Sequence, residues 1–304
     1  MDMKPVPARH VYPGYTQAEL DLAYSQRNWA ENADQILGRW SSAVDAVRAA
    51  SPSYREFRYG PEADELIDLY PAPGRPRHAH FHIHGGAWRA QSKSDCAFLA
   101  PLMRAVNVNF LVPEFGKLPQ QRLPQVLAHL IRALRWTYDN QIRTGRVGKI
   151  LISGHSSGAH MAALLAMQDW AVLGVDAAAF LGFVCISGAY DLEPVLLSSR
   201  RSYIDLSEAE ARQMSPILHA GRTCLPLHLL YGTRESPEFI RQSLTSAKAL
   251  GSENKLAACL EIPGKNHFEI MDALADPDEA VAQYVLKLFH EPNAACRPPN
   301  EMSI

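Results

Sequence analysis

Gly154, Ser156 and Gly158 form a G-x-S-x-G pattern within the segment KILISGHSSGAHMAALLAMQ at 149–168. The apolar residues before the pattern predict a β-strand, and the run rich in Ala, Leu and Met after it predicts a helix. A sharp turn between such elements is a nucleophile elbow, in which the glycines relieve crowding around a strained serine. We therefore expect the Ser156 hydroxyl above the carboxyl edge of a sheet, placed to attack a carbonyl carbon.

A serine hydroxyl is a weak nucleophile, so it needs a base to take its proton and a third group to orient that base. Where this elbow occurs, the chain order is serine, acid, histidine, with the last two on loops after later strands. His267 follows the last strand expected and is the predicted base. Glu235 follows the strand expected at 225–231 and is the predicted acid. Glu238 is the alternative, although Pro237 favours a place for Glu238 inside a helix.

The negative charge that develops on an attacked carbonyl oxygen needs backbone N–H groups already aimed at it. The segment His84-Gly85-Gly86-Ala87-Trp88 follows a predicted strand and is an H-G-G element of the kind that supplies such donors. We predict that the N–H groups of Gly85, Gly86 and Ser157 form the oxyanion hole. Further side chains could line the substrate pocket or pack in the core: Trp88, His160, Tyr190 and Phe268.

Four histidines alternate from His78 to His84, so a strand would place them all on one face. Such a row could bind zinc, but metal sites usually include carboxylates or cysteines, and ligands stacked along one strand diverge. We therefore expect no metal and no cofactor, with His84 in the oxyanion loop and His78 and His80 near the solvent end. The alternative, a metal-dependent hydrolase, predicts inhibition by chelators.

The composition predicts a soluble globular protein. The chain has 304 residues, of which 47% are hydrophobic and 20% charged, and its formal net charge is −2. That charge gives no electrostatic case for nucleic acid or an anionic membrane surface. No apolar run approaches the roughly 20 residues that span a bilayer, and no secretory signal is visible at the N-terminus. Five scattered cysteines are typical of a cytoplasmic protein, so we expect a cytoplasmic chain that acts on a small molecule, with a homodimer as a possible assembly.

The elements needed to position these residues follow from periodicity. From residue 78 onward, predicted strands alternate with helices, which indicates an α/β fold with a mostly parallel sheet covered on both faces. We expect a single domain over 1–304, with an N-terminal helical segment at 1–54, a lid at 190–222 and a loose tail at 291–304. Strands are expected at 55–59, 65–70, 78–84, 107–112, 180–186, 225–231 and 256–262, and helices at 16–50, 95–106, 123–142, 237–250 and 278–290, the first capped by Thr16 and Glu19.

Taken together, these segments resemble the serine-dependent arylformamidases (kynurenine formamidases) of the α/β-hydrolase superfamily. The resemblance covers nearly the whole chain and implies that Ser156 is the nucleophile, Glu235 the acid and His267 the base. It lies in ELDLAYSQRNW at 19–29, HGGAW at 84–88, GHSSGAH at 154–160, SGAYDLEP at 187–194, EAEARQMSP at 208–216, ESPEFIRQS at 235–243 and NHFEI at 266–270.

Two positions depart from the family pattern. Ala87 stands where tyrosine is usual, which removes bulk and a hydroxyl near the acyl pocket, and Glu235 stands where aspartate is commoner. We predict a serine hydrolase that cleaves a formyl or small acyl amide from an aryl- or enamine-type nitrogen, with N-formylkynurenine or a related enamide as substrate. The alternatives are a broad-specificity carboxylesterase for short acyl esters and a non-catalytic binding protein of the same fold.

Overall fold

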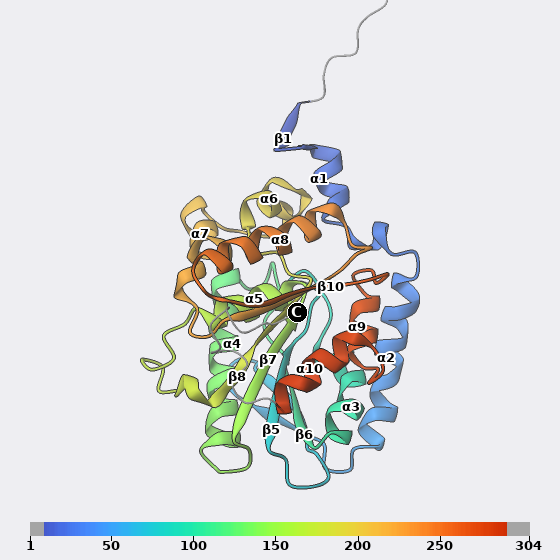
Figure 1. Cartoon of the computed structure of the whole chain (residues 1–304), viewed down its shortest axis with the longest axis vertical. Coiled ribbons are helices and arrows are strands. Elements are labelled where there is room, and N and C mark those ends of the chain that lie inside the picture. Colours follow the sequence, from blue (N-terminus) through green and yellow to red (C-terminus); the bar gives the residue numbers. More distant parts are fainter. Residues whose placement is uncertain (1–8, 291–304) are drawn as a thin grey trace, which may run out of the picture.

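The computed structural model describes residues 9–290, and its centre is an eight-stranded sheet (Figure 1). The strand order is β10-β9-β8-β7-β5-β6-β4-β3. Every pair from β10 to β6 is parallel, whereas β4 pairs antiparallel with both β6 and β3. The strands are β3 (Arg55–Arg58), β4 (Leu66–Tyr70), β5 (His78–Ile83), β6 (Val108–Pro113), β7 (Lys149–His155), β8 (Phe180–Ile186), β9 (Leu227–Gly232) and β10 (Leu256–Ile262), with β1 (His10–Tyr12) and β2 (Tyr15–Thr16) paired separately.

Helices cover both faces of this sheet, as predicted. One face packs against α2 (Ala33–Ala49), α3 (Ala100–Ala105), α9 (Glu269–Leu274) and α10 (Ala280–His290), which lie together at the right of Figure 1. The other face packs against α4 (Leu123–Thr137), α5 (Ser157–Ala166) and α8 (Pro237–Ser252). Each face has its own buried apolar cluster, so two hydrophobic layers fix the sheet that carries the candidate site.

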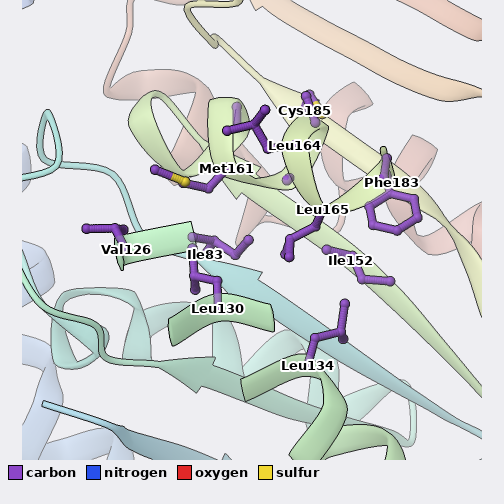
Figure 2. Packing of buried hydrophobic residues seen from close by; sticks show 14 of the residues in the cluster. Ile83, Val126, Leu130, Leu134, Ile152, Met161, Leu164, Leu165, Phe183 and Cys185 are labelled. Atoms are coloured by element: carbon purple, nitrogen blue, oxygen red, sulfur yellow. The ribbon is translucent and has the colours of Figure 1, made fainter. Parts of the chain in front are cut away.

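Helix α5 is buried along its whole length, which explains why its sequence is apolar on every side. Figure 2 shows Met161, Leu164 and Leu165 of α5 packed among Leu130 of α4, Ile152 of β7 and other apolar side chains. Burying a side chain of this size contributes roughly 1.5–3 kcal/mol, so these contacts hold the start of α5 firmly on the sheet.

The prediction of one long N-terminal helix at 16–50 is wrong. The structure has α1 (Gln17–Ala23), a short 3-10 helix η1 (Gln26–Trp29) and then α2. The predicted capping box of Thr16 and Glu19 is present at the start of α1. The amide of Gln26 donates to Ala23 O and to Ser236 Oγ, a contact with a distant loop that a helical periodicity does not reveal.

Other boundaries also differ from the expectations. The helix expected at 95–106 is divided into a 3-10 helix η2 (Lys93–Leu99) and α3, and the helix expected at 123–142 ends in a π-helical turn η3 (Tyr138–Ile142). Helix α9 was not predicted, and the predicted tail at 291–304 lies outside the described residues.

The segment 190–222 consists of α6 (Leu192–Leu197), η5 (Ser199–Ser202), α7 (Glu208–Gln213) and η6 (Pro216–Arg222), and its action as a lid stays a prediction. Within residues 9–290, no helix is both long and apolar enough to cross a membrane.

Candidate active site

Ser156 stands at the tip of the turn between β7 and α5. Its φ of +55° and ψ of −118° are strained for a residue with a side chain. The turn is possible because a Cβ on Gly154 would lie 2.2 Å from Gly158 O, and one on Gly158 would lie 2.1 Å from Ile83 O. The N–H of Ser156 donates to Ile186 O over 2.8 Å, which ties the elbow to the neighbouring strand. The local geometry is that of a nucleophile elbow.

The structure brings Ser156, His267 and Glu235 together from three distant parts of the chain. His267 Nε2 lies 2.9 Å from Ser156 Oγ, and His267 Nδ1 lies 2.9 Å from Glu235 Oε2. Because a carboxylate only accepts, Nδ1 carries the ring proton and Nε2 is left to accept from the serine hydroxyl. All three side chains are buried, so the pair of hydrogen bonds operates away from bulk water.

Glu235 is held by two further donors. The N–H of Gly232 donates to its Oε1 over 2.7 Å and the hydroxyl of Ser187 donates to the same oxygen over 2.5 Å. Ser187 is fully buried at the end of β8 and has a strained φ of +56°. The alternative acid, Glu238, lies in the first turn of α8 and bonds Arg241 over 2.7 Å, so it does not face His267.

The loop that carries His267 is held by a hydrogen bond from a second histidine, His155. His155 Nε2 lies 2.8 Å from the backbone oxygen of His267, so Nε2 carries the proton and donates. Burial and the neighbouring His267 ring hold the pKa of His155 well below its ordinary value, so this ring is neutral. On the far side of the loop, Asn266 Oδ1 accepts from the N–H groups of Phe268 and Glu269, each over 3.0 Å. Sequence reasoning missed both His155 and Ser187, although each lies in a segment that carried the family resemblance.

The predicted oxyanion loop has an unusual backbone. Gly86, Ala87 and Trp88 have φ values of +95°, +54° and +59°, and a Cβ on Gly86 would lie 2.0 Å from Ala90 O. The N–H of Trp88 donates to Ser157 Oγ over 3.1 Å, which joins this loop to the start of α5. Within the part of the chain that the structure describes, the N–H of Gly86 has no hydrogen-bond partner. Ser157 is the first residue of α5, so its N–H has no acceptor within the helix.

The four predicted pocket residues are all buried, and their part in a pocket stays a prediction. Trp88 and His160 meet edge to face at 5.2 Å, and Phe268 meets the ring of His267 at 5.4 Å. Tyr190, like Trp88, is 1% exposed and belongs to the core cluster on this face of the sheet, and its hydroxyl donates to Cys185 O. A cavity of about 410 Å³ lies between η6 and α8, and none of the predicted site residues lines it.

Of the four alternating histidines, His80 and His82 on β5 and His84 just after it are fully buried, whereas His78 at the start of β5 is half-buried. His80 Nε2 and His82 Nδ1 lie 2.6 and 2.7 Å from the hydroxyl of Ser153, and His80 Nδ1 lies 3.2 Å from Met103 Sδ. The expectation that His80 lies near solvent is wrong, because Phe289 of α10 covers it and leaves it fully buried. Burial lowers the pKa of His80 to about 3. Over residues 9–290, no three His, Cys, Asp or Glu side chains are grouped so that they could hold a metal ion.

Comparison with known proteins agrees with this fold. A family model described as an alpha/beta hydrolase fold matches residues 80–214. A crystal structure of a candidate thioesterase from Silicibacter sp. superposes with a TM-score of 0.78 at 24% identity, over 90% of this chain and 99% of that one. The mostly parallel sheet, with a serine elbow between a central strand and its helix, therefore has the α/β-hydrolase fold.

The chain is similar in sequence to a kynurenine formamidase and to an esterase. A kynurenine formamidase of Danio rerio is 26% identical in an alignment that covers 89% of this chain and 96% of that protein. An esterase of Mycobacterium tuberculosis is 27% identical over 70% of this chain and 56% of its own length. Within the α/β-hydrolase superfamily, the predicted resemblance to the arylformamidase (kynurenine formamidase) family is confirmed.

Proposed function

We propose that the protein is an amide hydrolase that releases a formyl or small acyl group from an aryl- or enamine-type nitrogen. The observation that carries this proposal is the chain of hydrogen bonds from Ser156 through His267 to Glu235, both of them 2.9 Å long. Acyl transfer needs an activated hydroxyl with a base and an orienting carboxylate, and these three residues supply those parts. The similarity to kynurenine formamidases supports a formamide as the substrate.

The mechanism follows from the direction of the hydrogen bonds. His267 Nε2 takes the proton of Ser156 as Oγ attacks the carbonyl carbon, and Glu235 stabilises the imidazolium that forms. The N–H groups of Gly85, Gly86 and Ser157 stabilise the oxyanion. His267 then gives its proton to the departing nitrogen, which leaves an acyl-serine. Water, activated by the same histidine, releases formate or a small acid and restores the hydroxyl of Ser156.

The class of leaving group follows from the chemistry of the bond. Nitrogen attached to an aromatic ring or a double bond is weakly basic, so its C–N bond breaks more readily than that of a peptide. The acyl side of the substrate would lie beside Ala87 and Trp88 of the oxyanion loop, because Trp88 is joined to Ser157 next to the nucleophile. Trp88 is 1% exposed and backed by His160, which favours a small acyl group there.

A short-chain carboxylesterase is the second candidate, since the similarity to the esterase of Mycobacterium tuberculosis favours it. An activated serine cleaves activated esters as well as amides, so turnover of an aryl ester does not separate the two functions. The comparison that separates them is kcat/KM for N-formyl-L-kynurenine and other N-formyl or N-acyl enamides against kcat/KM for short acyl esters.

We expect at least one formamide to exceed the best unactivated ester in kcat/KM by about 100-fold or more, a difference in transition-state stabilisation of about 2.7 kcal/mol. Good turnover of N-formyl-L-kynurenine would define a formyl-sized acyl pocket. Poor turnover of N-formyl-L-kynurenine with good turnover of another enamide would keep the reaction class and assign the difference to the pocket beside Ala87. Turnover of esters alone would reject the amide hydrolase in favour of the carboxylesterase.

A further inference from the structure

His84, the first residue of the H-G-G element, faces an oxygen acceptor at each of its ring nitrogens. Nδ1 lies 3.0 Å from the backbone oxygen of Gly85, and Nε2 lies 3.1 Å from Glu114 Oε1. The ring is fully buried, so water is not an alternative partner. A carbonyl oxygen and an ionised carboxylate can both accept a hydrogen bond, but neither can donate one. Both contacts are therefore hydrogen bonds only if His84 carries a proton on each nitrogen.

The other possible source of the second proton is Glu114 itself, but its surroundings hold it ionised. Its Oε1 accepts from the N–H of Phe115 over 3.3 Å and faces Lys117 Nζ at 3.3 Å, while its Oε2 accepts from the N–H of Lys93 over 3.2 Å. Burial favours the neutral acid, whereas the groups other than His84, namely the ammonium of Lys117 and the N–H groups of Lys93 and Phe115, favour the carboxylate. Glu114 therefore accepts the hydrogen bond from His84 as an anion.

The remaining groups around this pair are compatible with an imidazolium. The ring of Phe115 stacks on His84 with centroids 4.2 Å apart and planes 8° apart, and an aromatic face attracts a cation. On β5, burial and the adjacent His80 and His84 keep the pKa of His82 well below its ordinary value, so that ring is neutral. The ionisable groups that η2 contributes have other partners or are neutral. The ammonium of Lys93 pairs with Glu56 and Asp68, the carboxylate of Asp95 accepts from Ser41 and Ser92, and burial raises the pKa of the Cys96 thiol.

The position of Gly85 O connects this charge to the oxyanion hole. Gly85 C=O and Gly86 N–H belong to one peptide group, and the N–H of Gly86 has no partner among the residues described. A charged donor on the carbonyl end of a peptide withdraws electron density from the amide and strengthens the hydrogen bond that its N–H donates. A proton held on His84 therefore acts on the atom that would meet the developing oxyanion.

We infer that His84 is a positioning residue, held as an imidazolium by Glu114, that polarises the Gly85–Gly86 peptide so that Gly86 donates more strongly to the oxyanion. This inference rests on the proposed function, because it assigns a purpose to the oxyanion loop. The oxyanion exists only in the transition state, so the loss of the charge should lower kcat and leave KM nearly unchanged. We expect about a tenfold loss of kcat, less than the 100-fold or more that follows removal of an oxyanion donor.

The test uses two variants that remove the charge in different ways. In Glu114→Gln, the amide can turn its NH2 toward His84 Nε2, which allows the ring to be neutral. In His84→Asn, a neutral amide can still donate to Gly85 O. The matched control is Glu65→Gln, since Glu65 is also fully buried and ion-paired, here with Arg132, but contacts no residue of the site. Values of kcat and KM are measured for N-formyl-L-kynurenine and for 4-nitrophenyl acetate.

We expect kcat to fall about tenfold in both Glu114→Gln and His84→Asn relative to Glu65→Gln, with KM nearly unchanged. A loss of kcat in Glu114→Gln no larger than in the control, or a loss that appears in KM instead of kcat, would overturn the inference. Activity on the ester without activity on any formamide would reject the proposed function, and the same kcat ratios on the ester would still decide the role of His84.

A spectroscopic measurement decides the protonation state without any activity. In the wild-type protein with 15N-labelled histidine, both ring nitrogens of His84 should carry protons at neutral pH, and Glu114→Gln should leave one. The His84→Asn variant identifies the signal. A wild-type ring with a single proton at neutral pH would contradict the inference, whatever the kinetics show.

Discussion

Two serine–histidine pairs lie three residues apart along the chain, and only one of them has the surroundings of a nucleophile. Ser153, in the middle of β7, lies 2.6 Å from His80 and 2.7 Å from His82. Ser156, just beyond the end of β7, lies 2.9 Å from His267. Judged by distance alone, either serine could give its proton to a histidine.

The difference lies in what stands behind each histidine. Behind His267 is the carboxylate of Glu235, 2.9 Å from Nδ1, which can stabilise the imidazolium that forms when Ser156 loses its proton. Behind His80 is the sulfur of Met103, and burial lowers the pKa of that histidine to about 3. A ring that cannot hold a second proton near neutral pH cannot act as a base there. The third residue, rather than the serine–histidine contact, makes the nucleophile.

The largest expected effect tests this comparison directly. Ser156→Ala should lower kcat by about 10⁴- to 10⁶-fold with the fold intact, because the variant lacks only the hydroxyl that attacks the carbonyl carbon. Ser153→Ala, the matched control three residues away, should keep activity within about tenfold, yet lose roughly 1–3 kcal/mol of unfolding free energy because His80 and His82 lose their partner. Turnover and urea unfolding of both variants provide the check. Wild-type-like turnover in Ser156→Ala would end the proposed mechanism.

A smaller effect is expected from the carboxylate. Glu235→Gln should lower kcat by about 10³- to 10⁴-fold, because an amide cannot stabilise the imidazolium and favours the wrong tautomer of His267. The control is Glu238→Gln, since Glu238 is equally buried three residues on but pairs with Arg241. That variant should keep kcat within a few-fold while losing stability. Equal losses of kcat in the two variants would mean that Glu235 does not stabilise the imidazolium of His267. The difference between Ser156 and Ser153 would then need another explanation.

The residues that could be predicted from the sequence share one property. Ser156, Glu235 and His267 each follow a recognisable strand, so the order of strands along the chain was enough to select them. The parallel sheet was predictable for the same reason, since alternating strands and helices leave few other topologies. The distances among the three residues, by contrast, depend on the order of β7, β8, β9 and β10 in the sheet, which the structure provides.

The residues that were missed act across segments that no local pattern joins. Ser187 meets Glu235 across 48 positions, and His155 meets the His267 loop across 112. Glu114 follows β6 without any motif, yet it is the partner that distinguishes His84, just after β5, from the neutral His80 within β5. The break in the N-terminal helix has a similar origin, because Gln26 bonds to Ser236, which is 210 residues away. Tertiary contacts of this kind override local propensity.

The smallest expected effect concerns the pair that does not catalyse. Burial lowers the pKa of His80 to about 3, whereas in the unfolded chain this histidine titrates near 6.5. Between these values the unfolded state binds the extra proton, so the stabilising contribution of His80 is complete above about pH 6.5 and is lost as the pH falls, by roughly 1.4 kcal/mol per pH unit. His160 and His228, whose pKa values burial lowers to about 4, add to the same slope. In His80→Gln the unfolding free energy, measured in urea at about pH 7 and pH 5, should be lower at both values but depend less steeply on pH, by about one proton. An unchanged slope would mean that His80 is not held neutral in the folded protein, and the contrast between the two serine–histidine pairs would then reduce to the position of Ser156 at the edge of the sheet.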